Sequence, residues 1–229
     1  MRRPSPHDGF SLTELLIVVC VVLILAALCM PRMLQAINTL RLRGSAETFA
    51  GLLQKARMQA ARDNKFYTVI PNGGLGLVND ACVDLNWNQT CSNQDYRVQL
   101  ANGVTFTTAA PDTTVITCGP LTTPCPAGYN GLNFNPEPQA TVLPSFNARG
   151  LPCVNNSGAS TEPVWPANLC VNNDPNPPFN GAPVGFVYTM MLTSSVGTKY
   201  AAVVVTPAGR ILVYTYEGQD SNGGNVWTR

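Results

Sequence analysis

The chain contains 229 residues, of which 12% are charged, and its formal net charge at pH 7 is +1. A chain of this length holds one membrane helix and one globular domain of ordinary size. A net charge so close to zero provides no general attraction to nucleic acid, so we expect no nucleic-acid partner.

The N-terminal segment carries the most informative pattern. A polar leader, residues 1–9, ends at Gly9, and an uncharged apolar run covers residues 15–30, with one carboxylate, Glu14, just before it. An ordinary secretory signal has its small-residue cleavage site after the apolar stretch and therefore loses that stretch. Here the small residue comes first, so a cut after Gly9 would leave the apolar helix on the mature protein.

The order G-F-S-L-T-E-L-L, followed by an apolar helix and Pro31, resembles the prepilin signature of type IV pilins and type II secretion pseudopilins. The resemblance implies that a prepilin peptidase cuts after Gly9 and methylates the new N-terminus, Phe10. It also implies that Glu14 acts in assembly, neutralised in the filament core by a liberated amino terminus, its own or a neighbour's. A carboxylate costs about 2.5–3.5 kcal/mol at the centre of a membrane helix and less near an end. The alternative is a plain signal anchor that happens to carry these residues.

The orientation follows from the positive-inside tendency, by which Arg2 and Arg3 hold the leader in the cytoplasm, although Arg32 stands at the opposite membrane edge. We expect a single-pass protein of the bacterial inner membrane with a cytoplasmic N-terminus and a periplasmic C-terminal domain. Display of that domain on a filament is compatible with this topology.

One long N-terminal helix is expected over residues 10–65, with its transmembrane part at about 12–31. Pro31 removes one backbone hydrogen bond and should kink the helix. Beyond it, apolar residues at helical spacing predict a stripe that packs on a sheet, and Asp63 and Asn64 end the pattern. The stripe comprises Leu34, Ile37, Leu40, Phe49, Leu52, Leu53, Ala56 and Ala60.

Charge is divided unevenly along the mature chain. Residues 32–65 have an excess of five positive charges, and residues 66–229 have an excess of four negative charges. A positive helix can bind DNA or lipid phosphates. A solvated helix face is the simpler interpretation, because a DNA receptor would need the opposite sign on its exposed domain.

Residues 66–229 are expected to form a periplasmic or extracellular β domain, with disulfide-bridged loops at about 79–183. The fold class is therefore α+β, a long helix packed on an antiparallel β domain. Asn72-Gly73-Gly74 predicts a hairpin turn, and the C-terminal runs predict a meander. The expected strands are residues 66–70, 75–78, 96–100, 104–108, 114–118, 132–134, 142–146, 185–192, 200–206 and 210–217.

The eight cysteines form two groups. Cys20 and Cys29 lie in the apolar run, where small packing residues are the expected interpretation. The other six are an even number, which suits an oxidising compartment, and the absence of Cys-x-x-Cys argues against a zinc knuckle or redox pair. Six cysteines allow fifteen connectivities. Because loop closure favours near neighbours, we predict the pairs Cys82–Cys91, Cys118–Cys125 and Cys153–Cys170.

Catalysis is not expected, because the only histidine, His7, lies in the leader. The mature chain then has no imidazole for a Ser-His-Asp arrangement or a His-ligated metal. Asp80 and Asp84 are expected in a surface turn rather than in an acid–base pair. We expect neither cofactor nor metal. The oxygen-rich segments 172–174 and 217–222 leave calcium as an alternative, but neither has EF-hand spacing.

Three segments narrow the resemblance. Residues 56–64, followed directly by a strand, resemble the end of the long helix in pseudopilin H and FimT-like minor pilins, and residues 146–150 and 205–210 resemble that family's strand–turn segments. The implied function is a pseudopilin, a structural subunit of a type II secretion filament that drives protein export. A minor pilin of a type IV pilus, acting in pilus assembly, adhesion or DNA uptake, is the alternative. The implied partners are the prepilin peptidase, other pilins or pseudopilins in a helical filament, and the inner-membrane assembly platform.

Overall fold

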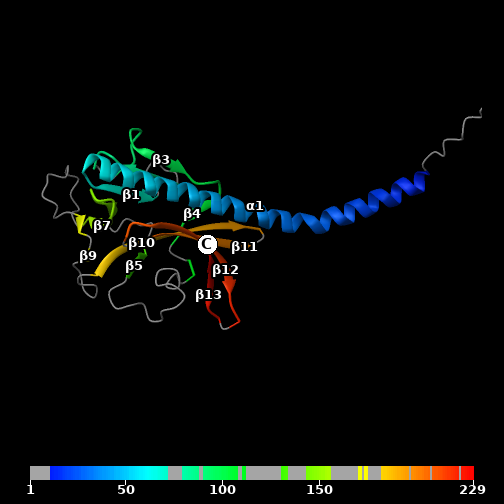
Figure 1. The fold of residues 1–229 in the computed structure, drawn as a ribbon. Helices are drawn as coiled ribbons and strands as arrows, with labels where there is room; N and C mark the ends of the chain where they lie inside the picture. Colours follow the sequence, from blue (N-terminus) through cyan, green and yellow to red (C-terminus); the bar gives the residue numbers. More distant parts are fainter. Residues whose placement is uncertain are drawn as a thin grey trace, which may run out of the picture.

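A computed structural model describes residues 11–71, 79–87, 90–107, 110–111, 130–133, 143–155, 170–171, 173–174, 182–195, 197–206, 208–221 and 223–229. In this part of the chain, a long helix, α1 (Leu12–Asp63), leads into a head of antiparallel β-sheets (Figure 1). The α+β fold class is therefore confirmed. The leader with Gly9 and Phe10, the cysteines Cys118 and Cys125, and the expected strands 75–78 and 114–118 lie outside the described residues.

The described strands form two sheets. The first has the order β3-β2-β1-β6-β7-β8 and the second the order β13-β12-β11-β10-β4, with β5 and β9 also paired to β10. All pairings are antiparallel except that of β5 with β10. The first sheet comprises β1 (Tyr67–Pro71), β2 (Asp80–Asp84), β3 (Tyr96–Gln99), β6 (Leu143–Phe146), β7 (Pro152–Asn155) and β8 (Cys170–Val171). The second comprises β4 (Val104–Phe106), β10 (Ala182–Ser194), β11 (Gly197–Val205), β12 (Ile211–Gln219) and β13 (Asn225–Thr228), with β5 (Asn130–Asn133) and β9 (Asn173–Asp174) beside β10.

The placement of Asp80 and Asp84 corrects the sequence interpretation. Both were expected in a surface turn, but both lie in β2 and are buried. The polar ends of the segment D-A-C-V-D suggested a turn. In the structure β2 pairs with β1 on one side and β3 on the other, so that its whole length is interior.

The C-terminal half of α1 packs across both sheets. Its buried residues recur at alternating spacings of four and three, which keeps them on one side of the helix. The stripe prediction was wrong for Leu34 and Leu40, which are 44% and 70% exposed. Leu40 precedes Phe49 by nine positions, about half a turn beyond two full turns, so it faces the opposite way. The buried positions at this spacing are Leu42, Ala46, Phe49, Leu53, Ala56 and Ala60.

Phe49 occupies the centre of the core. Its ring meets the edges of Phe106 and Tyr188 at centroid distances of 5.0 and 4.8 Å. The period of two along a strand brings alternate residues of β10 and β11 toward α1. Those residues are Phe186, Tyr188, Met190 and Leu192 of β10, and Ala201, Val203 and Val205 of β11.

The end of α1 lies where the polar pair predicted it. Asn64 takes a left-handed conformation, with φ 53°. The hydroxyl of Tyr67 and the amide of Gln59 donate hydrogen bonds to the Asp63 carboxylate. These two bonds hold the pKa of Asp63 below its usual value, the Tyr67 bond contributing most. The last turn is thereby tied to the first strand.

Arg57 joins α1 to two β turns. Its Nη1 atom donates a hydrogen bond to the carbonyl of Gly209 over 2.8 Å, and its side chain also lies against Gly150. Both glycines have positive φ, 69° at Gly150 and 77° at Gly209. The three segments that carried the narrower resemblance, 56–64, 146–150 and 205–210, therefore meet at one side chain.

Two alanine substitutions at glycine should have opposite effects on stability. Gly209→Ala should destabilise the head by about 1–3 kcal/mol, because the new Cβ would lie 2.8 Å from the Gly150 carbonyl in a left-handed backbone. Gly44→Ala should stabilise by about 0.5–1 kcal/mol, since it is helical and nothing lies within 4 Å of the added carbon. Urea unfolding of the full chain in detergent, followed by tryptophan fluorescence, would measure both. Equal changes in unfolding free energy at Gly209 and Gly44 would contradict the close packing of Gly209 against Gly150 and Arg57.

Candidate functional site

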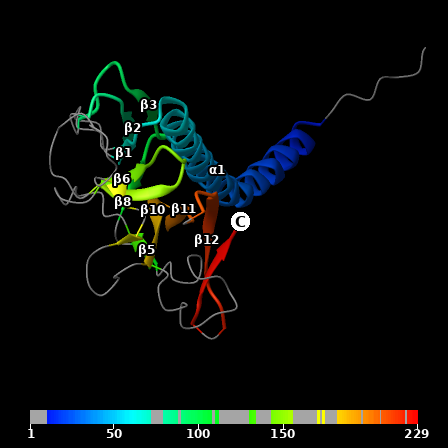
Figure 2. The same ribbon diagram turned by 60° about the vertical axis from the view of Figure 1, so that its left-hand side comes forward.

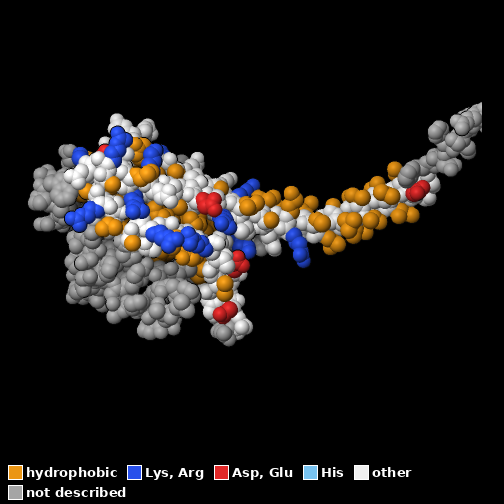
Figure 3. Space-filling view, viewed as in Figure 1, with side chains coloured by type: hydrophobic (Ala, Val, Ile, Leu, Met, Phe, Trp, Pro, Cys, Tyr) orange, Lys and Arg blue, Asp and Glu red, His pale blue; other side chains and the backbone are white. Residues whose placement is uncertain are grey.

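The N-terminal half of α1 projects from the head without touching it. Every described side chain from Leu12 to Ala36 is exposed. Just beyond this segment, the amide of Asn38 donates a hydrogen bond to the Ser194 hydroxyl at 3.0 Å. This projecting segment has about 25 residues and is about 37 Å long. Figure 3 shows it as a narrow, mostly hydrophobic rod beside the head.

The projecting segment is apolar on all sides. Leu12, Leu15 and Leu28 are among its large side chains, each more than half exposed. Burial of one such side chain stabilises by about 1.5–3 kcal/mol, so a rod of them cannot remain in water. The segment is long and apolar enough to cross a membrane, as a transmembrane span or a signal anchor.

Glu14 is the one charged residue between Leu12 and Met30. It stands in the first turn of α1, where the Ser11 carbonyl accepts hydrogen bonds from the backbone N–H groups of Glu14 and Leu15, both at 3.1 Å. A carboxylate is favourable at this end of a helix dipole. The structure thus places Glu14 at the tip of the rod, but its predicted partner, the amine of Phe10, lies outside the described residues.

Pro31 lies inside α1, which continues through it to Asp63. Figure 2 shows that the helix axis changes direction between the projecting half and the half that packs on the head. The kink assigned to Pro31 itself stays a prediction. Cys20 and Cys29 are both free and exposed on the rod, and the packing role expected for them stays a prediction.

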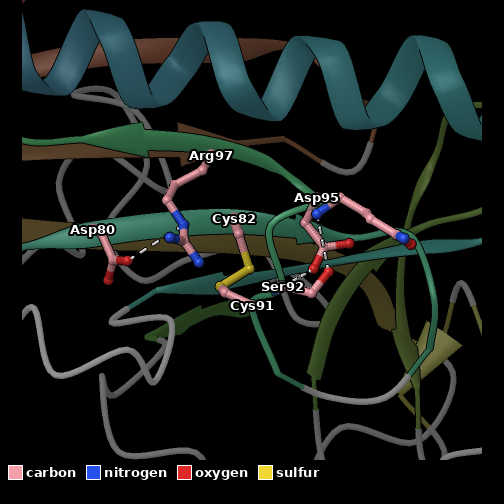
Figure 4. Close-up of polar contacts among 7 residues, drawn as sticks. Asp80, Cys82, Cys91, Ser92, Asp95 and Arg97 are labelled. Atoms are coloured by element: carbon pink, nitrogen blue, oxygen red, sulfur yellow. Dashed lines mark hydrogen bonds and ion pairs between the residues drawn. A yellow bond between two sulfur atoms is a disulfide. The ribbon is translucent and has the colours of Figure 1, made fainter.

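One predicted disulfide is confirmed. Cys82 of β2 is bonded to Cys91, nine positions along the chain. Figure 4 shows this bond at the base of the loop that leads from β2 to β3. Cys153 is also disulfide-bonded, but its partner lies among the side chains that are not described, so the pairing with Cys170 stays a prediction.

Asp95 organises the same loop from inside. Its carboxylate accepts hydrogen bonds from the backbone N–H groups of Leu85 and Ser92, and it is 8% exposed. Asp80 lies 3.6 Å from the Nε atom of Arg97 on the neighbouring strand (Figure 4). The carboxylates of this region are therefore part of the framework of the head.

Sequence reasoning missed the loop residue that fastens this region to the junction between α1 and β1. The indole of Trp87 donates a hydrogen bond to the Phe66 carbonyl at 3.0 Å and stacks on Tyr67, with 5.7 Å between ring centroids. Lys65 lies over the same indole, 4.6 Å from its centroid. Trp87 has φ 53°, which is unusual for a large side chain, so this packing holds it there. No periodic signal marks a single loop tryptophan in advance.

Potential metal ligands do not gather in the described part of the chain: no group of three or more His, Cys, Asp or Glu side chains converges there. Of the two oxygen-rich segments, Glu217 and Asp220 lie on the β12–β13 hairpin, and Asn172 is outside the described residues. Comparison of the chain with protein families, curated proteins and solved structures finds no match.

Removal of the Cys82–Cys91 bond should cost the head about 2–3 kcal/mol, chiefly because the unfolded chain gains freedom. The double variant Cys82→Ala/Cys91→Ala would be compared with Cys20→Ala/Cys29→Ala, whose thiols lie on the rod and should leave head stability unchanged. Urea unfolding provides the measurement.

Non-reducing peptide mapping of the wild type would test all three predicted pairs, and alkylation of Cys82 in protein isolated from membranes would refute an oxidising compartment.

Proposed function

We propose that this protein is a pilin-like structural subunit, a pseudopilin of a type II secretion system that assembles into an inner-membrane-anchored filament. The observation that carries the proposal is the projecting half of α1. It is apolar on all sides, makes no contact with its own head, and bears a single carboxylate in its first turn. The residues just before it, Gly9 and Phe10, match the prepilin cleavage site.

The dimensions of the rod suit both environments that a filament subunit occupies. A helix about 37 Å long exceeds the hydrocarbon thickness of about 30 Å, so it can cross the membrane with the head outside. A helix that is apolar all round is buried all round, in lipid or among other helices. Lipid tails and leucine side chains are comparably apolar, so the hydrophobic effect alone does not decide between them.

Glu14 supplies the difference between the two environments. In lipid, its charge is uncompensated and unfavourable. In a filament, a liberated amino terminus placed beside it would neutralise that charge. Processing after Gly9 creates this amine, so cleavage and assembly are coupled through a single carboxylate in the proposed mechanism.

The compartment agrees with the proposed topology. Formation of the Cys82–Cys91 bond requires an oxidising environment, such as the periplasm. The single apolar helix then separates a short cytoplasmic leader from a periplasmic head. A plain signal anchor would have the same topology, but it would use neither a cleavage site before the helix nor the carboxylate.

Deletion of the gene, with complementation by the wild type, would test the proposed function. Loss of type II protein export with unchanged pilus-dependent motility is the expected result. Loss of motility with normal export would instead assign the chain to a type IV pilus as a minor pilin. If both remain normal and the protein is absent from sheared filament fractions, the plain anchor is correct.

A further inference from the structure

Exposed positive charge gathers on one side of the described head. The C-terminal half of α1, which packs on the head, bears four exposed basic residues. The two turns that meet Arg57 add one exposed basic residue each. The exposed acidic residue of this half of α1, Glu47, forms an ion pair with Arg43 at 3.0 Å. Figure 3 shows Lys and Arg side chains along the helix side of the head. We refer to this surface as the basic face: Arg41, Arg43, Lys55, Arg62, Arg149 and Arg210.

Exposed negative charge lies on the β12–β13 hairpin. Glu217 and Asp220 are both exposed there. No Lys or Arg occurs between Ile211 and Thr228, and the exposed Arg210 and Arg229 flank the two ends of this segment. We refer to this element, residues 211–228, as the acidic hairpin. Its first residues, Ile211 and Val213, pack against the core beneath α1, and its tip projects away from α1 in both ribbon views (Figures 1 and 2).

The acidic hairpin is held in shape by its own contacts. At its tip, the backbone N–H of Gly224 donates to the Asp220 carboxylate at 2.7 Å. Near its base, the Thr228 hydroxyl donates to Glu217 at 2.8 Å, and the rings of Tyr216 and Trp227 lie 5.2 Å apart. A preformed hairpin presents its charges without a large ordering cost on binding.

Lys55 and Arg62 lie at the end of α1 that Arg57 ties to Gly209, just before β12 begins. Glu217 and Asp220 lie at the other end of β12, toward a hairpin tip that projects away from α1 (Figures 1 and 2). Contact between two copies through like surfaces would place equal charges together, which is unfavourable. Contact through unlike surfaces that lie too far apart on the head to pair reciprocally is heterologous, leaves one free surface at each end, and continues as a helical array unless the rotation closes a ring. Opposite charges at the two ends of β12 therefore favour a continuing assembly.

We propose that the acidic hairpin of one copy docks on the basic face of a second copy, at Lys55, Met58 and Arg62. The inference rests on the proposed function as a filament subunit and adds the head-to-head contact to it. These three residues share one side of α1 by their spacing of three and four. Lys55 is held over the Tyr96 ring at 3.4 Å, and Met58 is 66% exposed between the two cations. Exposed ion pairs are individually weak, so the contact sets the register of subunits that the rods hold together.

Cysteine cross-linking of the full chain in assembled filaments tests the contact directly. The variant would carry Met58→Cys and Ser221→Cys, with Cys20→Ala and Cys29→Ala to remove the free thiols of the rod. Because the contact is heterologous, oxidation should produce a ladder of dimers, trimers and longer species. Either single cysteine should remain monomeric. A control pair of Ser221→Cys with Asn93→Cys, an exposed residue two positions after Cys91, should give no ladder.

Charge reversal tests the electrostatic basis. The double variant Glu217→Lys/Asp220→Lys should reduce the yield of the ladder by about tenfold, and Lys55→Glu/Arg62→Glu should do the same. In each case the two contacting surfaces would carry charges of the same sign and repel each other. All four substitutions together should restore it, which a folding defect would not. Raising NaCl from about 0.05 to 0.5 M should weaken the wild-type ladder, since screening shortens the reach of exposed charges.

The outcomes separate this inference from the proposed function. If wild-type protein is processed and present in sheared filaments, but the Met58/Ser221 pair gives no ladder, the docking contact is overturned and the filament function stands. The same holds if the ladder forms but is indifferent to charge reversal and salt. If the wild type never enters filaments, both proposals fail.

Discussion

Replacement of Gly9 by Val should leave the chain as an uncleaved precursor that is almost absent from filaments. The prepilin resemblance places the cut after Gly9, and a β-branched side chain there would obstruct the peptidase. Without cleavage no amine is liberated at Phe10, so Glu14 has no partner, and the charged leader remains in the cytoplasm. Intact-mass analysis of the membrane fraction should find wild-type protein beginning at methylated Phe10.

The matched control is Ser5→Val, which makes the same kind of change inside the leader, away from the cut. It should be processed normally. A wild-type mature protein that begins beyond Met30 would refute the filament proposal, because the rod would have been removed as an ordinary secretory signal.

Glu14→Ala should reduce incorporation into sheared filaments at least tenfold while leaving membrane insertion intact or improved. Removal of the carboxylate takes a charge out of an apolar segment, which favours insertion. In the filament it would leave the Phe10 amine uncompensated, and breaking a buried charge pair in this way costs about 3–5 kcal/mol. Quantitative immunoblots of the membrane and sheared fractions would measure both effects.

Glu14→Gln and Thr13→Ala define what the carboxylate contributes. Gln keeps the size of the side chain and removes its charge, so it should fail like Ala. Thr13 is an exposed neighbour on the same rod, and its substitution should have little effect. Normal incorporation of both Glu14 variants would show that the charge pair does not hold the filament together.

The rod was predictable from local sequence because the patterns that define it involve only neighbouring residues along the chain. An uncharged apolar run, a preceding carboxylate and the polar pair at residues 63–64 predicted one long helix, and α1 ends at Asp63. Closing a short loop costs little conformational entropy, which is why the Cys82–Cys91 pair, nine positions apart, was also predictable.

The position of each strand within the head depended on pairing, which a local pattern does not contain. Asp80 and Asp84 are the polar ends of a five-residue segment, but β2 lies between two partner strands and both carboxylates are buried. The short strands β7 and β13 were not predicted, since each consists of four residues with a weak alternation. Leu40 matched the helical stripe loosely, and only the position of the sheets decides which side of α1 is covered.

The sequence by itself determined the features that depend on neighbours along the chain: the rod, the place of Glu14 on it, the end of the helix and the local disulfide. Tertiary structure alone decided that Arg57 joins two distant turns and that Trp87 is held against the start of the first strand. It also decided that the tip of the acidic hairpin projects away from α1, which carries most of the basic face. The physical reason is that these arrangements require long-range strand pairing, whose register is set by the burial of whole sheet faces rather than by the residues of any one segment.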